Sequence, residues 1–331
     1  MSVTIREVAR AAEVSVSTVS RAFTAPDLVN EATRQRVLAT AEELGYRPNR
    51  AARGLITGRT GNIGVLIPDL ANPFFHGILQ GVQDRARTAD HWVFLADSGE
   101  DPRAEYELIL QMAKQVEGIV VCSSRMTALQ LEQVVGVTSL VFLNRRVAGV
   151  PSVLMDSGGG GQQAVDHLAA LGHRRVAYLS GPRNSWSNKE RRRGLRNAAR
   201  RVGMDILELG PFTPGFDAGV QGADLAVAAG VTAIIAYNDL MALGVLSRLA
   251  DRDIPVPASV SVLGFDDIPL AAMTVPSLTT VAVPKEAAGR AAVDLLLGLL
   301  VTGTGGEART ELPTQLIVRA STAPPPPGTA N

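Results

Sequence analysis

Residues 4–23, TIREVARAAEVSVSTVSRAF, carry the pattern of two short helices joined by a tight turn. Thr4 and Glu7 have the spacing of a capping box, in which a hydroxyl and a carboxylate satisfy free backbone groups at a helix start. Ser15 follows the turn as the expected N-cap of the second helix. Glu13 lies in the turn itself, where a positive φ would cost a non-glycine residue about 1 kcal/mol.

The second helix, over residues 16–23, has one apolar face and one face of small polar side chains. Helical spacing places three apolar side chains against the rest of the bundle: Val14, Val19 and Phe23. Three others are left pointing outward: Val16, Ser17 and Arg21. The outward face needs an explanation, because its residues neither build a core nor form a simple charged surface.

A third helix is predicted from about Glu31 to Leu44, and Gly45 and Pro48 would end it. Its buried face would hold Val37, Leu38, Ala41 and Leu44. Three short helices with a three-residue turn between the first two make a helix-turn-helix unit, which we place over residues 1–47. The same periodicity also fits a small helical bundle with a solvated face.

In a helix-turn-helix unit, the second helix lies in the DNA major groove and its first residues reach base edges. Val16 could contact a thymine methyl group, Ser17 could donate or accept a hydrogen bond, and Arg21 could pair with guanine O6 and N7. Hydroxyls near the helix starts are better suited to phosphate oxygens: Thr4, Ser15 and Thr18. Residues 1–60 hold nine arginines and six acidic residues, a net charge of +3 that permits DNA contact without requiring it.

From about residue 61, short apolar runs alternate with helical patterns to about residue 319. This alternation predicts parallel sheets covered by helices on both faces. Some 260 residues of it suggest a core over 61–320, made of two doubly wound subdomains with crossings near residues 157 and 285 and a cleft between them. A helix ending at Leu171 would begin after the GGGG run at 158–161, and residues 321–331 would form a disordered tail.

The composition fits a soluble globular protein, with 331 residues, 46% hydrophobic and 19% charged. The first residues, MSVTIREVAR, lack the apolar core of a signal peptide, and no uncharged apolar run reaches the length of a membrane span. Cys122 is the single cysteine and can form neither an internal disulfide nor a metal cluster. We therefore expect a cytoplasmic protein without cofactor or metal.

Residues 46–60, YRPNRAARGLITGRT, are basic and poorly patterned for a core. Together with TIREVARAAEVSVSTVSRAF and the later blocks PDLANPFF, RRRGL, AIIAYNDLMALG and VSVLGFDD, they resemble the LacI/GalR family of transcriptional regulators, over the chain to about Arg319. The resemblance implies a helix-turn-helix domain, a hinge helix over 48–60, and a core similar to type I periplasmic binding proteins. It also implies a homodimer that binds a palindromic operator, usually as a repressor, and responds to a small effector.

The resemblance further implies how the hinge would meet DNA. Leu55 would wedge into a central base step in the minor groove with Ala52 packed beside it, while Arg50 and Arg53 face phosphates. Asn49 belongs to the same set of DNA contacts. Gly54 departs from a good helix former and weakens the hinge helix by roughly 0.5–1 kcal/mol relative to alanine. A hinge with this sequence should depend strongly on DNA and dimer contacts.

Polar residues follow several predicted strands, and ligands of doubly wound sheets bind at such strand ends. The candidates are Asp69, Asn144, Asn238 and Asp266, with Arg191 on a helix; four aromatic residues could stack on a ligand: Phe74, Phe75, Trp186 and Phe212. This set suits a polyhydroxylated ligand. Each residue also has a plainer role: aspartates cap helices, aromatic residues fill cores, and Arg191 is one of three consecutive arginines.

The family resemblance favours the ligand role at three of these positions, and implies that Arg191, Asn238 and Asp266 contact the effector. We expect a sugar or a sugar derivative. Asn144, however, stands where sugar-responsive members often have aspartate, so the sugar's identity does not carry over.

The sequence argues against an enzyme. His76, His91, His167 and His173 lack metal-ligand spacing, no GxSxG elbow is present, and GGGG lacks the following residues of a phosphate loop. The main alternative is a solute-binding protein of the same core fold. It would need an exported N-terminus and no helix-turn-helix, so the first 60 residues count against it. Nothing in the sequence separates a repressor from an activator.

Overall fold

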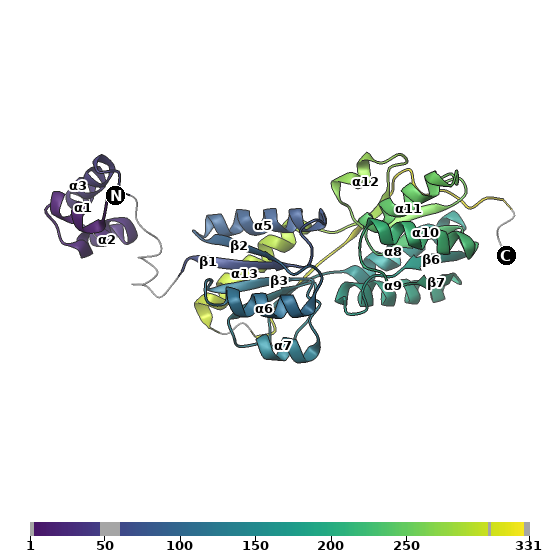
Figure 1. Cartoon of the computed structure of the whole chain (residues 1–331), viewed down its shortest axis with the longest axis horizontal. Helices are drawn as coiled ribbons and strands as arrows, with labels where there is room; N and C mark the ends of the chain where they lie inside the picture. Colours follow the sequence, from purple (N-terminus) through teal and green to yellow (C-terminus); the bar gives the residue numbers. More distant parts are fainter. Residues whose placement is uncertain (1–2, 47–59, 304–305, 328–331) are drawn as a thin grey trace. The chain divides into compact units, whose positions relative to one another are not determined.

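The structure, a computed structural model, describes residues 3–46, 60–303 and 306–327 (Figure 1). The chain divides into two compact units, Met1–Gly61 and Asn62–Asn331. No helix within the described residues is long and apolar enough to span a bilayer.

The first unit contains α1 (Ile5–Ala11), α2 (Val16–Thr24), a short 3-10 helix (Pro26–Leu28) and α3 (Glu31–Glu43). Its core is built from residues of all three α-helices, among them Val8, Val19 and Val37, each fully buried. The prediction that Leu44 joins this core is wrong, since 39% of it is exposed. The helix ends at Glu43, and Tyr46 instead packs there, its ring 6.0 Å from that of Phe23.

The second unit consists of two lobes. The sheet of the first lobe has the strand order β11-β5-β4-β3-β1-β2, with every pairing parallel. Its strands are β1 (Asn62–Ile67), β2 (Trp92–Asp97), β3 (Gly118–Cys122), β4 (Ser139–Leu143), β5 (Ser152–Met155) and β11 (Arg309–Leu312). Its helices are α5 (Phe74–Thr88), α6 (Pro102–Met112), α7 (Ala128–Val134) and α13 (Lys285–Thr302).

Alternate residues of the strands face opposite layers, as expected for a sheet buried on both sides. Ile63, Val65 and Ile67 pack with α5 and α13, whereas Leu66 packs with α6 and α7. Accordingly, α5 lies on one side of the sheet and α6 and α7 on the other (Figure 1). The predicted doubly wound core is confirmed.

The second lobe has the strand order β12-β10-β9-β8-β6-β7, in which β12 is antiparallel to β10 and the other pairings are parallel. Its strands are β6 (Arg175–Leu179), β7 (Asp205–Leu209), β8 (Ala233–Ala236), β9 (Ser261–Asp266), β10 (Thr279–Ala282) and β12 (Gln315–Ile317). Its helices are α8 (Ser157–Leu171), α9 (Trp186–Val202), α10 (Phe216–Ala228), α11 (Asp239–Asp251) and α12 (Pro269–Met273). Helices α8 and α9 pack on one face, and α10 and α11 on the other.

The chain crosses from one lobe to the other three times: after β5 and before α8, after β10 and before α13, and after β11 and before β12. The sequence does not predict the last passage, at residues 313–314. The first lobe therefore combines residues 62–155 with 285–312, and the second lobe interrupts it.

The four glycines at 158–161 lie inside α8, not before it as predicted. Asp156 caps the helix, its Oδ1 accepting the Gly159 N–H at 2.7 Å. The glycines allow α8 and α9 to touch backbone to backbone: a Cβ on Gly194 of α9 would lie 2.0 Å from the carbonyl oxygen of Gly158. Close packing therefore outweighs the low helix propensity of glycine here.

The prediction of a disordered tail from residue 321 is wrong for its first residues. Ser321 is fully buried and its hydroxyl donates to the Val262 carbonyl at 2.6 Å. The Ala323 carbonyl meets His173 Nε2 at 2.9 Å, while His173 Nδ1 meets the Thr232 hydroxyl at 2.8 Å. These bonds fasten residues 321–323 along the second lobe; residues 328–331 lie outside the described part of the chain.

Candidate functional site

The turn before α2 has the predicted geometry. Glu13 has φ of +53°, and the Ser15 hydroxyl oxygen accepts the Thr18 N–H at 3.1 Å, which confirms Ser15 as the N-cap. Thr4 N–H donates to Glu7 Oε2 at 2.7 Å at the start of α1, as the capping-box spacing predicts. Both helix starts are therefore set by local side chains.

The outward face of α2 carries the three predicted side chains. Val16, Ser17 and Arg21 are exposed, whereas Val19 and Ala22 are buried on the opposite face. Ser17 and Arg21 stand one helical turn apart, so they lie side by side. Arg21 makes no side-chain hydrogen bond or ion pair with another described residue, so its guanidinium is available to a partner.

Other predicted DNA contacts fall into two groups. Thr4, Ser15 and Thr18 lie at the starts of α1 and α2, with Thr4 and Ser15 exposed and Thr18 half-buried. The hinge residues lie outside the described residues, and their DNA contacts stay predictions: Asn49, Arg50, Ala52, Arg53 and Leu55.

A second candidate site lies between the two lobes of the core, at the carboxyl ends of their strands. Six of the predicted effector residues line one cavity: Phe74, Phe75, Asn144, Arg191, Asn238 and Asp266. The sequence did not single out the other lining residues: Asn72, Glu100, Ser123, Arg125, Ser187, Pro214 and Tyr237. The cavity measures only about 20 Å³, which is room for about one water molecule.

Arg191 is a buried cation of this cavity that contacts several neighbours. It is 4% exposed, and its Nη2 lies 3.2 Å from Asp266 Oδ1. Its Nη1 donates to the Tyr237 carbonyl, and its guanidinium lies 4.3 Å from the centre of the Phe265 ring. Its Nε has no hydrogen-bond partner among the described atoms, so the guanidinium retains one buried donor for a ligand.

Asp266 is held in an unusual environment. Burial raises the pKa of its carboxyl to about 6, and the raise is opposed by the charges of Arg191 and Lys285. Lys285 Nζ donates to the Asp266 carbonyl at 2.6 Å, which ties α13 of the first lobe to the end of β9 in the second. A carboxyl with a pKa near neutrality in a cleft is typical of a functional group.

The first lobe contributes a matching arginine. Arg125 is 3% exposed, and its Nε and Nη2 meet the two carboxylate oxygens of Glu100 at 2.5 and 3.0 Å. Arg125 follows β3, so the rule that selected Asn144 and Asp266 could also have found it. The cavity thus presents an arginine–carboxylate pair from each lobe.

Two amides in the cavity are partly committed to the fold. Asn144 Oδ1 accepts the Met155 N–H at 3.2 Å and joins the ends of β4 and β5. Asn238 caps α11, its Oδ1 accepting the Met241 N–H at 3.0 Å. Each amide oxygen keeps a second lone pair for a ligand, and the NH₂ group of Asn144 also contacts Met155 Sδ at 3.7 Å.

The backbone is strained around this cavity. Ser123, Asn144 and Asp266 have φ values of +48°, +54° and +112°, although none is glycine. Such residues cost about 1–3 kcal/mol each and gather at functional sites.

Three predicted effector residues do not line this cavity. Asp69 Oδ1 accepts the Ala71 N–H at 2.8 Å and so shapes the turn after β1. Phe212 packs against the apolar cluster of α10 and α11. Trp186 lines a different and larger cavity.

The described residues contain no group of three or more His, Cys, Asp or Glu placed to hold a metal ion. Burial raises the pKa of Cys122 to about 12, which keeps this thiol protonated and unreactive.

Comparison with known proteins bears on both sites. Residues 4–49 match the family model for bacterial regulatory proteins of the lacI family, and residues 165–322 match that of the periplasmic binding protein-like domain. Catabolite control protein A of Priestia megaterium is 33% identical over 333 residues, spanning 97% of this chain and 100% of that protein.

Two solved structures are similar over nearly the whole chain. The transcriptional regulator CelR in complex with cellobiose is 31% identical, with a TM-score of 0.72, over 96% of this chain and 99% of that one. The lac repressor dimer bound to operator and the anti-inducer ONPF is 27% identical, with a TM-score of 0.87, over 98% and 100%.

Proposed function

The chain belongs to the LacI family of bacterial regulatory proteins, and we propose that it represses transcription by binding a palindromic operator as an effector-controlled homodimer. It is a transcriptional regulator and not an enzyme. The observation that carries the proposal is the exposed trio Val16, Ser17 and Arg21 on a helix that buries Val19 and Ala22 on its opposite face. The alternative, a solute-binding protein without a DNA role, leaves this unit unexplained.

Substitution of Arg21 tests base reading by α2. Arg21→Ala should weaken binding to the operator by about 1–3 kcal/mol and relax the preference at one base pair per half-site. Arg10→Ala removes the same charge from an exposed position of α1 and serves as the control. Affinities for the operator and its single-base variants, measured by fluorescence anisotropy at fixed salt, separate a loss of base reading from a general loss of positive charge. An equal loss on all sequences for Arg21→Ala would contradict base reading.

Exposed apolar side chains on both lobes support a homodimer. On β2, an edge strand, Trp92, Phe94 and Leu95 are 44–63% exposed. In the second lobe, Met273 and Val275 are 73% and 98% exposed. Such side chains mark association surfaces. A monomeric mass in solution at micromolar concentration, by light scattering, would contradict the dimer.

The effector is proposed to be sugar-like and to bind around Arg191 and Asp266. Buried carboxylates, amides and a free guanidinium N–H offer the hydrogen bonds that hydroxyl groups need, and Phe74 and Phe75 offer apolar faces. Because the cavity is nearly closed, a sugar can enter only if the lobes separate. Effector affinity is thereby coupled to lobe arrangement, which is the basis of a switch.

A thermal-shift screen of sugars, polyols and nucleosides tests this assignment. A ligand at 100 times its Kd stabilises the folded state by about 2.7 kcal/mol, which is readily measured. Arg191→Lys should abolish the shift because lysine cannot contact Asp266 and the Tyr237 carbonyl together. Arg200→Lys, on an exposed position of the same helix, should leave it unchanged. A shift that survives Arg191→Lys would place the effector elsewhere.

A further inference from the structure

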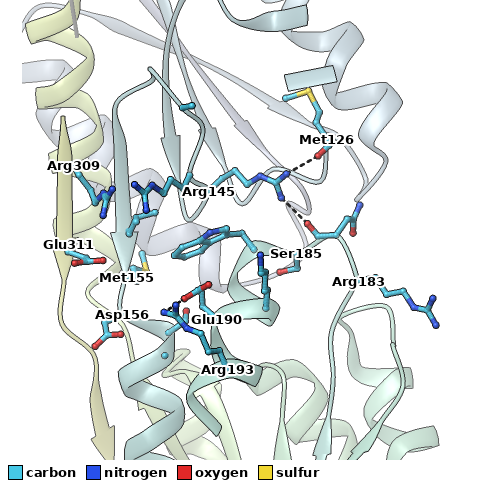
Figure 2. A pocket seen from close by; sticks show the side chains of 18 of the residues that line it. Met126, Arg145, Met155, Asp156, Arg183, Ser185, Glu190, Arg193, Arg309 and Glu311 are labelled. Carbon is cyan, nitrogen blue, oxygen red and sulfur yellow. Dashed lines mark hydrogen bonds and ion pairs between the residues drawn. The ribbon is translucent and has the colours of Figure 1, made fainter. Parts of the chain in front are cut away.

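A second cavity, of about 830 Å³, lies between the lobes (Figure 2). It shares no lining residue with the one around Arg191. We define it as the Trp186 cavity. It is bounded by the segments that follow β3 and β4, by the passage from β5 into α8, by the start of α9, and by β11. Its volume lies within the range of small-molecule sites, whereas the Arg191 cavity holds about one water molecule.

The lining of the Trp186 cavity is rich in cations. It includes Arg145, Arg146, Arg183, Lys189, Arg193 and Arg309. Arg193 pairs with Glu190, but Arg146, Lys189 and Arg309 make no side-chain hydrogen bond or ion pair with another described residue. Charges left without a counter-ion on the wall of a cavity attract a ligand of opposite sign.

The acidic residues of the lining are fewer than the basic ones, and two of them already have partners. They are Asp156, Glu190, Glu307 and Glu311. Asp156 caps α8 and Glu190 pairs with Arg193. Glu311 lies beside Arg309 on β11, at one edge of the cavity (Figure 2). The part of the wall formed by Arg145, Arg146 and Lys189 therefore stays positive.

Two helix N-termini open onto the same cavity. Ser157 and Gly158 begin α8, Trp186 begins α9, and all three line the cavity. These helices have 15 and 17 residues, and helix N-termini carry partial positive charge that favours anions such as phosphate. The half-buried Trp186 ring adds a flat apolar surface on which a planar group can stack.

Arg145 lines the cavity and also links the two lobes. From the first lobe, its Nη1 donates to the Asn184 carbonyl in the second lobe at 3.1 Å, and its Nη2 donates to the Met126 carbonyl at 3.2 Å (Figure 2). Asn184 Nδ2 donates back to the Arg125 carbonyl at 2.8 Å. A molecule bound beside Arg145 would touch both lobes in their present arrangement.

We propose that the Trp186 cavity is a second regulatory site that binds a phosphate-bearing small molecule. The cations and the N-terminus of α9 hold the phosphate, since the Asp156 carboxylate already caps α8. Trp186 packs against the rest of the molecule. Because the site contacts both lobes, its occupancy stabilises the arrangement in which Arg145 reaches Asn184. This inference extends the proposed function, since the site uses none of the residues that line the Arg191 cavity.

Isothermal titration of the full-length protein with three probes tests the proposal: pyrophosphate, ATP and adenosine. Pyrophosphate and ATP should bind, ATP more tightly and with quenching of tryptophan fluorescence, and adenosine should not bind. The double variant Arg146→Glu/Lys189→Glu should weaken binding about tenfold or more, equivalent to about 1.4 kcal/mol or more. Trp186→Phe should remove the quenching. Arg200→Glu, which makes one such charge reversal at an exposed position of α9 outside the cavity, is the control.

Several results would overturn the assignment. One is the absence of pyrophosphate and ATP binding to a wild-type protein that binds its operator. Another is equal weakening by Arg200→Glu and by the double variant, which would show a diffuse charge effect. Loss of binding in Arg21→Ala or Arg191→Lys, with the double variant unaffected, would place the anion on α2 or in the Arg191 cavity. Circular dichroism and unfolding temperature verify that each variant is folded.

Discussion

The contact between α8 and α9 predicts a severe effect from one added methyl group. Gly194 lies on α9 one turn after Arg191, and its added Cβ would stand 2.0 Å from the carbonyl oxygen of Gly158. Cβ atoms essentially never approach closer than 3.0 Å to such atoms, so the helices must separate by about 1 Å or more in Gly194→Ala. The flexible end of a side chain could yield, but the obstacle here is backbone.

Two opposing contributions set the magnitude. Forcing an extra group into a packed core destabilises a protein by about 1–3 kcal/mol. Alanine in place of a helical glycine recovers up to about 1 kcal/mol through helix propensity. We therefore expect Gly194→Ala to lower the free energy of unfolding by roughly 1–2 kcal/mol. A shift of α9 would also carry Arg191 away from Asp266, which lies 3.2 Å from it, and weaken effector binding.

Urea unfolding followed by circular dichroism measures the free energy, and the chain offers a matched control. Gly298 lies inside α13 with no heavy atom within 4 Å of its hypothetical Cβ. Gly298→Ala should stabilise the protein by roughly 0.5–1 kcal/mol through propensity alone. If Gly194→Ala were as stable as the wild type, or if both variants shifted stability equally, backbone contact would not be what requires glycine in α9.

Three further perturbations have defined outcomes. Leu55→Ala should lower operator affinity in a gel-shift assay while preserving half-site preference, and unchanged affinity would contradict a minor-groove wedge. Because burial raises the pKa of Asp266 to about 6, effector affinity should fall below pH 6, by at most about tenfold per pH unit, as the carboxylate acceptor is protonated. Asp266→Asn should remove that pH dependence in titration calorimetry, and its persistence would assign the titration to another group. Glu13→Gly should stabilise the helix-turn-helix unit by roughly 0.5–1 kcal/mol by relieving the positive φ, seen as slower amide hydrogen exchange in α1 and α2; faster exchange would argue against strain there.

The sequence predicted the central strands and the edge strands β2 and β12, but not the edge strands β7 and β11. Strands such as β1, with NIGVLI, are apolar because both faces are buried, so they stand out from their surroundings. The edge strands β7 (DILEL) and β11 (RTEL) are partly solvated, and their mixed composition resembles that of a loop. The prediction placed the glycine run before α8, whereas it lies inside that helix. The close contact with α9 explains these glycines, and the local sequence pattern does not show that contact.

Helix geometry explains which part of the candidate site was predicted. Ser187 and Arg191, one turn apart on α9, line the same cavity. Trp186 and Glu190 project from another side of that helix and line the Trp186 cavity. The prediction placed Trp186 in the same site as Arg191 because an aromatic ring could stack on a ligand, although their positions five residues apart differ by more than 100° around the helix. Which cavity each face meets depends on tertiary packing.

The interruption of the first lobe by the second has a consequence for biosynthesis. The helix-turn-helix unit precedes both lobes on the chain, so it leaves the ribosome before them and has all of its core residues at once. The first lobe, by contrast, is incomplete until α13 and β11 are made, which follow the strands they cover or extend by about 130 residues or more. A messenger RNA truncated before the codons for α13 would yield the helix-turn-helix unit attached to an incomplete first lobe.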